Sequence, residues 1–202
     1  MNDASFSSAE GEKGRGAGIS PSILDAIGWT PLVALDRLGE GLPGRVALKI
    51  EGANPGASIK DRAALQCIAE AERAGHLKPG GVVVELTSGN MGTGLAIVCA
   101  IKGYRFIAVM SVGNSRERVQ MLRALGAEVD LVPQMPGGVP GQVSGDDLAL
   151  VEERTRALVR TLGAFRPDQF NNPANVRAHE LTTGPEIWAQ TEGAVTHFCA
   201  IV

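Results

Sequence analysis

Short runs of apolar residues alternate along this chain with longer stretches in which apolar residues recur every three to four positions. The short runs are typical of buried strands, and the longer stretches are typical of helices. We predict strands at residues 46–50, 82–86, 106–110, 128–132 and 196–202. We predict helices at residues 58–74, 91–102, 115–125 and 146–162, and a further helix inside 175–190. Because helices separate successive strands, the pattern favours an α/β fold with a parallel, doubly wound sheet.

Residues at the edges of the predicted elements support these boundaries. Ser58 is a suitable N-cap for helix 58–74, and Gly75 suits the left-handed position that ends it. Residues 95–101 are apolar on every side, so we expect that helix to be buried all round. Residues 133–145 are rich in Gly and Pro and predict an irregular loop.

Composition narrows the class of protein. The 202 residues carry a net charge of −3 and only eight aromatic side chains, which argues against a nucleic-acid surface. The longest apolar run is much shorter than the roughly 18–20 residues of a membrane span. Residues 1–18 lack an apolar core and are rich in Gly, Ser and charge, so they predict a disordered tail and no secretory signal.

The three cysteines indicate a reducing compartment. Cys67, Cys99 and Cys199 lie in apolar segments without C-x-x-C spacing, so we expect buried, reduced thiols. The three histidines are scattered and lack metal-ligand spacing. We therefore expect a cytoplasmic protein with no disulfide framework and no metal site.

A first candidate for chemistry is the segment Asn54-Pro-Gly-Ala-Ser-Ile-Lys-Asp-Arg62. Lys60 falls in the first turn of a predicted helix, where a cation opposes the helix dipole by about 0.3–1 kcal/mol. That position favours the neutral amine needed to form a Schiff base. The alternative is a surface lysine whose charge is offset by Asp61. Of the five lysines, Lys60 is the only one at a predicted helix N-terminus.

A second candidate is the loop Thr87-Ser88-Gly89-Asn90-Met91, which joins a predicted strand to a helix. Its backbone N–H groups and its Thr and Ser hydroxyls form a suitable anion site for a carboxylate or a phosphate. Its glycines run G-x-x-G-x-G, the reverse of the dinucleotide-binding pattern. A plain strand-to-helix turn, with glycines for close packing, explains the pattern equally well.

A third candidate is the segment 168–175, followed by Thr-Thr-Gly-Pro-Glu-Ile-Trp at 182–188. Gln169 is either a neutral hydrogen-bonding arm aimed at a ligand or an ordinary loop glutamine. Pro185 suits the first turn of a helix.

Taken together, these segments resemble the β-replacing, pyridoxal-phosphate-dependent enzymes of the cysteine synthase (O-acetylserine sulfhydrylase) and cystathionine β-synthase family. The resemblance runs from about Ile27 to the last residue and keeps the family's order of motifs. The motifs are NPGASIKDR at 54–62, TSGN-x-G at 87–92, LRALGAEV at 122–129, QFNNPAN at 169–175 and TTGPEIW at 182–188.

The resemblance implies a role for each candidate residue. Lys60 would hold pyridoxal 5'-phosphate through a Schiff base and later serve as the base at the substrate's α-carbon. Asn90 would hydrogen-bond the phenolic oxygen of the cofactor. The substrate carboxylate would bind to residues of the loop and to the arm, namely Thr87, Ser88, Gly89, Met91 and Gln169.

The resemblance also implies a fold-type II architecture of two α/β domains with the cofactor between them. Residues 19–31 would be an N-terminal segment, and 32–53 with 173–202 would belong to the large cofactor domain. Residues 54–172 would form the smaller domain, with a mobile part at about 106–150. A homodimer is typical of the family.

The implied reaction is β-replacement on O-acetylserine, or a similar activated serine, by sulfide or a thiol to give L-cysteine. Three departures leave other reactions open, namely Met91 in place of threonine, the altered stretch 110–115, and Asp168 in place of glutamine. Cystathionine β-synthase-like and diaminopropionate synthase-like enzymes are the alternatives. The family's phosphate-binding loop would begin just after Val202, so we expect a C-terminally truncated sequence, and an inactive fragment is a further alternative.

Overall fold

A three-stranded parallel sheet forms the centre of the computed structural model, which describes residues 18–139 and 141–200. Its strands are β3 (Val82–Leu86), β4 (Arg105–Ser111) and β5 (Glu128–Val132), in the order β3-β4-β5. Phe165 extends the sheet beyond β3 by one residue, because its N–H and C=O bond Val82 and Val84 at 2.9 Å each. The predicted parallel sheet is confirmed.

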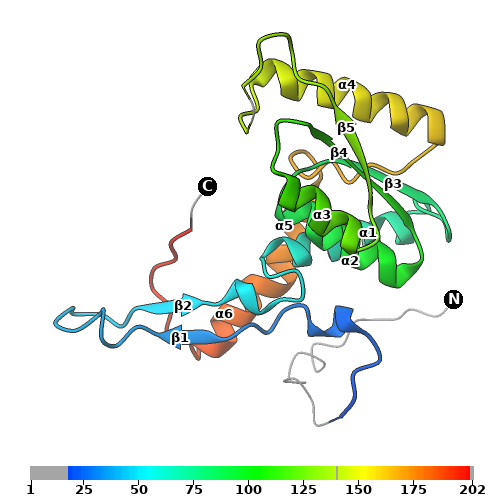
Figure 1. Ribbon diagram of the computed structural model, residues 1–202. Coiled ribbons are helices and arrows are strands. Elements are labelled where there is room, and N and C mark those ends of the chain that lie inside the picture. The colour runs from blue at the N-terminus through cyan, green and yellow to red at the C-terminus, as the bar shows by residue number, and fades with distance from the viewer. Residues whose placement is uncertain (1–17, 140, 201–202) are drawn as a thin grey trace, which may run out of the picture.

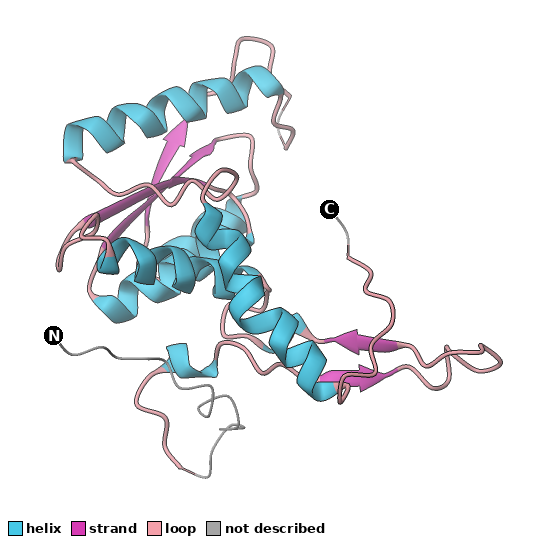
Figure 2. Ribbon diagram, turned by 180° about the vertical axis from the view of Figure 1, so that it is seen from behind, coloured by secondary structure: helices cyan, strands magenta, loops and turns pink. Residues whose placement is uncertain are grey.

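Helices cover both faces of this sheet (Figures 1 and 2). One face carries α1 (Lys60–Arg73), α2 (Asn90–Lys102) and α3 (Arg116–Ala124), and their apolar side chains form the larger core cluster. The other face carries α4 (Gly145–Leu162), which encloses a smaller cluster around Val84, Val109 and Val151. The predicted doubly wound arrangement is therefore confirmed.

The ends of these helices follow the local sequence closely. Ser58 does not occupy the N-cap position, which is Ile59, but its hydroxyl accepts the Lys60 N–H at 3.1 Å. Gly75 takes the left-handed conformation just after α1, as predicted.

The prediction that α2 is buried all round is wrong in its last turn, where Ile101 is 52% exposed. Ala100, in the same turn, is exposed as well, so this end of α2 meets solvent.

A second, smaller unit lies to one side of the sheet (Figure 1). Strand β1 (Leu32–Ala34) pairs antiparallel with β2 (Ala47–Lys49), so the strand predicted at 46–50 is confirmed, whereas β1 was not predicted. Two short 3-10 helices, η2 (Ile23–Ala26) and η3 (Glu51–Ala53), flank this hairpin in sequence.

The helix predicted within residues 175–190 is confirmed but has three parts: α5 (Pro173–Ala178), the π-helical turn η4 (His179–Thr183) and α6 (Gly184–Gln190). Pro185 lies in the first turn of α6, as expected. Proline has no N–H to donate to the preceding turn, so the hydrogen-bonding pattern changes from π-helical to α-helical just before Pro185.

The strand predicted at 196–202 is absent from its described part, residues 196–200. A strand forms only when a neighbour takes its backbone hydrogen bonds, and no strand of the described chain runs beside it. Cys199 is accordingly exposed, which corrects the expectation that it is buried, while Cys67 and Cys99 are buried free thiols as expected. Residues 201–202 lie outside the described part, as does nearly all of the tail predicted at 1–18.

A buried network of charges joins α1 to the hairpin and to α6. The Arg62 guanidinium, with a side chain 1% exposed, donates to both oxygens of Glu51 at 2.8 and 2.9 Å. It also donates to both oxygens of Glu186 at 2.5 and 2.7 Å. Lys49 adds a further bond to Glu186 at 2.8 Å and reaches the Thr30 carbonyl at the same distance.

The network has balanced charge, two cations against two carboxylates. Burial alone raises the pKa of Glu186, but hydrogen bonds from Arg62 and Lys49 outweigh burial and lower it to about 2. The carboxylate therefore stays ionised, and its pairing with Arg62 holds α6 against α1. None of the helices in the described part of the chain is long and apolar enough to span a membrane.

We expect Arg62→Ala to lower the free energy of unfolding by about 3–5 kcal/mol, because it leaves the partly buried Glu51 without its cation and the buried Glu186 with Lys49 alone. Arg105→Ala is the matched control, since Arg105 pairs with Glu128 at 2.6 Å but its side chain is 48% exposed. Exposed pairs contribute only about 0–1 kcal/mol. Urea denaturation measures both variants, and equal losses would contradict the importance of the Arg62 network.

Candidate functional site

The carboxyl end of β3 opens into a cavity of about 700 Å³. All seven residues singled out from the sequence line it: Lys60, Thr87, Ser88, Gly89, Asn90, Met91 and Gln169. They come from three separate segments, namely the start of α1, the loop between β3 and α2, and the segment before α5. In parallel α/β sheets this end of the strands is where ligands bind.

Lys60 is the first residue of α1, and the loop before it is held by two buried side chains. The Asn54 side chain, 4% exposed, accepts the Gly28 N–H at 2.9 Å and donates to the Ser58 carbonyl at 3.0 Å. The Asp61 carboxylate turns back to accept the Gly56 N–H at 2.5 Å. These contacts fix the backbone at Lys60 relative to the rest of the loop.

Asp61 does not neutralise Lys60, so the simpler interpretation of this lysine is not supported. Asp61 is 1% exposed, and its carboxylate bonds the Gly56 amide. Within residues 18–139 and 141–200, the Lys60 amine has no ion pair and no hydrogen bond. It is a half-buried amine on a fixed backbone at the wall of a cavity.

The glycines that follow β3 are present for different structural reasons. A Cβ at Gly92 would lie 2.8 Å from the Thr87 Cγ2, and one at Gly94 would lie 3.1 Å from the Lys60 carbonyl oxygen. These two glycines are therefore required by close packing, and Gly94 lets α2 approach the turn that carries Lys60. A Cβ at Gly89 would meet no protein atom within 4 Å, so that position stays open toward the cavity.

The polar atoms of the loop have separate tasks. The Thr87 hydroxyl oxygen accepts the Gly92 N–H at 3.0 Å, so it stabilises the start of α2. The Met91 side chain belongs to the core cluster, so this residue can offer a ligand in the cavity only its backbone. The first-turn amides of a helix have no intrahelical acceptors. The loop is thus suited to bind an anion mainly through backbone N–H groups.

Gln169 lies in a turn that is held by asparagines. The Asn172 side chain donates to the Pro167 carbonyl at 2.8 Å, and the Asn175 side chain donates to the Gln169 carbonyl at 2.9 Å. Asp168 takes a positive φ of 47° and accepts the N–H groups of Asn171 and Asn172. The side chain of Gln169 is thereby brought to the cavity wall.

The remaining lining residues were not predicted. They are Leu86 and Phe170, together with Gly145, Leu148, Ala149 and Glu152 of α4. The sequence of α4 is that of an ordinary amphipathic helix, and only its place over the sheet brings Glu152 to the cavity. Nothing in the local sequence distinguishes this glutamate from others on the same helix.

Glu85 lies directly beneath the loop and is 2% exposed. Burial raises the pKa of its carboxyl to about 7, against the opposing effect of Arg166. One carboxylate oxygen accepts the Leu86 N–H at 3.0 Å, and the other has no hydrogen-bond partner in the described structure. A titratable group thus lies two residues from the start of the anion loop.

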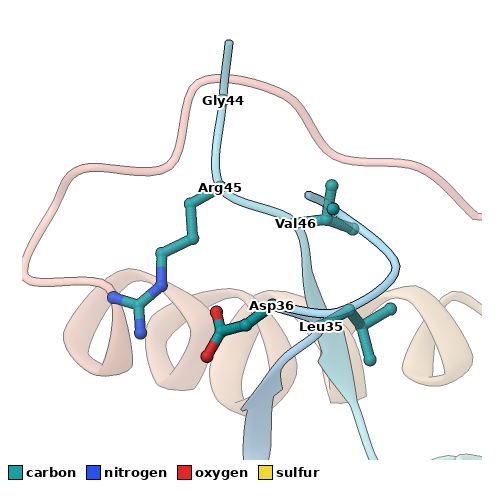
Figure 3. A pocket seen from close by; sticks show the side chains of 6 residues that line it. Leu35, Asp36, Gly44, Arg45 and Val46 are labelled. Atoms are coloured by element: carbon teal, nitrogen blue, oxygen red, sulfur yellow. The ribbon is translucent and has the colours of Figure 1, made fainter. Parts of the chain in front are cut away.

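A second hollow, of about 240 Å³, lies at the far end of the β1–β2 hairpin (Figure 3). Its side chains include Leu35, Asp36, Arg45 and Val46. It contains none of the candidate residues, and the larger cavity is the better candidate for chemistry.

Comparison with known proteins shows which proteins the chain resembles over most of its length. Residues 23–202 match the protein family described as "Pyridoxal-phosphate dependent enzyme". Over 177 residues the chain is 50% identical to cysteine synthase B of Escherichia coli (strain K12), covering 88% of this chain and 55% of the relative. It is 48% identical to cysteine synthase 3 of Caenorhabditis elegans, covering 87% and 50%.

Two solved structures are similar to this one. O-ureido-L-serine synthase has a TM-score of 0.73 at 41% identity, covering 87% of this chain and 52% of that chain. O-acetylserine sulfhydrylase isoform 3 from Entamoeba histolytica has a TM-score of 0.78 at 34% identity, covering 88% and 52%. The chain therefore spans about half the length of the curated relatives that it matches.

We expect Glu85 to make stability depend on pH. Its folded pKa of about 7 lies above the ordinary value of 4.5, so its contribution is present below about pH 4.5 and is lost as the pH rises through 7. Glu85→Gln cannot ionise and should lose this dependence. The difference in unfolding free energy between the two proteins should change by about 3 kcal/mol between pH 4 and pH 8. A difference that is constant with pH would contradict a raised pKa.

Proposed function

The chain belongs to the family of pyridoxal-phosphate-dependent enzymes, and from that premise we propose that the protein makes L-cysteine. In the proposed reaction, sulfide replaces the β-substituent of O-acetylserine or of a similarly activated serine. The names of the relatives, cysteine synthase and O-acetylserine sulfhydrylase, support this substrate pair.

One observation carries the proposal, namely the meeting of an unpaired amine, an anion loop and a neutral amide arm in one cavity. An amino acid substrate presents a carboxylate, an α-amino group and a leaving group on neighbouring carbons. The loop and Gln169 offer donors to the carboxylate, and Lys60 offers the amine. A site with only one of these parts would support no particular reaction.

The residues of the cavity fit pyridoxal 5'-phosphate. We propose that Lys60 holds the cofactor covalently and that Asn90, which is exposed in the same cavity, hydrogen-bonds its phenolic oxygen. The open space beside Gly89 leaves room for a ligand close to the backbone. When bound, the cofactor supplies an electron sink for the charge that develops at the substrate's α-carbon.

The chain itself supplies positioning and proton transfer. The backbone N–H groups of Ser88, Gly89 and Met91 bind the substrate carboxylate, and Gln169 closes on it. The Lys60 amine then takes the proton from the α-carbon onto Nζ, which is general-base catalysis by a positioned side chain. The Thr87 hydroxyl, whose oxygen already accepts the Gly92 N–H, can still donate its proton to the carboxylate.

The relative named O-ureido-L-serine synthase supports a second candidate, β-replacement with a nucleophile other than sulfide. Both reactions use the same cavity and the same Lys60 chemistry. Assays with O-acetylserine, O-phosphoserine and serine, each with sulfide or homocysteine, separate the candidates. Preference for homocysteine would overturn the assignment to cysteine synthesis.

We propose the following domains. Residues 19–31 form an N-terminal segment, 54–172 form the smaller domain with a mobile part at about 106–150, and 32–53 with 173–202 belong to a larger cofactor domain. The separation of the β1–β2 hairpin and α6 from the parallel sheet supports this division (Figure 1). We further propose that the protein is a homodimer and that it works in the cytoplasm. The buried free thiols of Cys67 and Cys99 are suited to that reducing compartment.

The first test concerns the anchor. After incubation with pyridoxal phosphate and reduction with borohydride, we expect mass spectrometry to find the cofactor on the peptide that contains Lys60. Lys60→Ala should lose this label and the sulfide-dependent activity, because within residues 18–139 and 141–200 no other lysine lines the cavity. Lys78→Ala is the matched control and should keep both. A label that persists in Lys60→Ala would show that Lys60 is not the anchor.

A second test concerns the carboxylate loop. Gly89→Ala should leave the unfolding free energy within about 0.5 kcal/mol of wild type, since its φ of −132° is ordinary and its new Cβ meets nothing. It should raise KM for O-acetylserine at least about tenfold, because the methyl group occupies the space of the carboxylate. Gly92→Ala should instead cost about 1–3 kcal/mol of stability. An unchanged KM in Gly89→Ala would place the substrate elsewhere.

A further inference from the structure

We propose that Arg166 is a positioning residue that holds three walls of the cavity together. Its guanidinium lies among carboxylates from α4, from the end of β3 and from the turn that carries Gln169. This inference rests on the proposed function for its effect on substrate, and on the structure alone for its effect on the walls.

The backbone of Arg166 is fixed to the sheet. One residue earlier, the Phe165 N–H donates to the Val82 carbonyl and the Phe165 carbonyl accepts the Val84 N–H, each at 2.9 Å. Pro167, one residue later, is buried, and its carbonyl accepts the Asn172 side chain at 2.8 Å. The guanidinium therefore projects from a backbone that cannot shift without breaking the edge of the sheet.

The firmest contact of Arg166 is with Glu152, which lines the cavity from α4. Two parallel bonds join them, Nη1 to Oε1 at 2.8 Å and Nη2 to Oε2 at 2.7 Å. Paired bonds of this kind fix orientation as well as distance. These two bonds fix the position of α4 relative to the turn of Gln169, which lies more than six residues after the end of that helix in sequence.

Two further carboxylates face the same guanidinium. Nε lies 3.7 Å from Oε1 of Glu85, and Nη2 lies 3.9 Å from Oδ1 of Asp168. Glu85 precedes the loop of Thr87 by two residues, and Asp168 directly precedes Gln169. One cation thus lies among three carboxylates, each on a segment that forms a different wall of the cavity.

The arrangement explains why a cation is required at this place. Without Arg166, the nearly buried Glu85 would lose the cation that lies beside it, and among the described residues Glu152 would keep Arg156 alone as a cationic partner. The two parallel bonds from Arg166 to Glu152 would also be lost, and with them the attachment of α4 to the segment 165–169. The donors of the loop and the amide of Gln169 would then no longer be held at a fixed separation.

The first experiment needs neither cofactor nor substrate. Hydrogen exchange of the purified protein should be at least about tenfold faster in Arg166→Gln over residues 146–156 and 167–172, which lose their connection. The core of α1, residues 63–71, should exchange as in wild type. Arg156→Gln is the matched control, since Arg156 bonds the same Glu152 at 2.6 Å from the solvent side, with a side chain 66% exposed. It should leave both segments unchanged.

The second experiment uses the protein loaded with pyridoxal phosphate. Arg166→Gln should raise KM for O-acetylserine by about 10- to 100-fold with a smaller change in kcat, because it displaces binding groups and spares Lys60. Arg166→Lys keeps the charge but not the paired geometry, so it should recover part of the loss. It is also the variant to measure if Arg166→Gln does not fold.

The possible failures are distinguishable. Unchanged exchange in both segments, or faster exchange that includes α1, would overturn the positioning role even where Lys60 carries the cofactor. A protein that fails to bind the cofactor at Lys60 would overturn the proposed function, while the exchange measurements would still decide the role of Arg166.

Discussion

The buried pairing of Arg62 with Glu51 and Glu186 is the interaction on which the rest of this structure depends. Arg62 follows Lys60 by two residues, so the network fixes the same helical turn that presents the amine to the cavity. Glu51 and Glu186 belong to segments 135 residues apart in sequence. The network therefore also attaches the β1–β2 hairpin and α6 to the start of α1.

The two ends of the cavity are stabilised by different physical means. On the Lys60 side, backbone atoms lie close together: Gly94 permits α2 to touch the turn of Lys60, and Asp61 bonds the Gly56 amide. On the α4 side, Val151 packs against the sheet, but contact with the segment before Gln169 depends on long charged side chains that are partly exposed, with Arg166 at 20% and Glu152 at 27%. Close packing allows little movement, whereas such ion pairs can break and re-form.

The sequence alone predicted the sheet and most helices because their apolar periodicity is strong and their boundaries carry caps such as Ser115 and Gly75. It also identified residues that the fold brings into one cavity, since those segments form recognisable motifs. Glu152 and Arg166 could not be found in this way, because their importance comes from a contact between distant segments. The strand expected at 196–202 failed for the related reason that a strand is a property of two partners.

The two sides of the cavity are attached to the rest of the structure with unequal strength. Separating α4 from the turn of Gln169 requires breaking a partly exposed ion pair, while separating α1 from α6 requires breaking a buried network of charges. The contact between α4 and the turn of Gln169 is therefore the one that can open at the lower cost in free energy. A ligand that bonds both the loop at Thr87 and the arm at Gln169 adds attraction across the cavity. A ligand of this kind therefore adds to the attachment of the turn of Gln169, while the buried network keeps Lys60 in place.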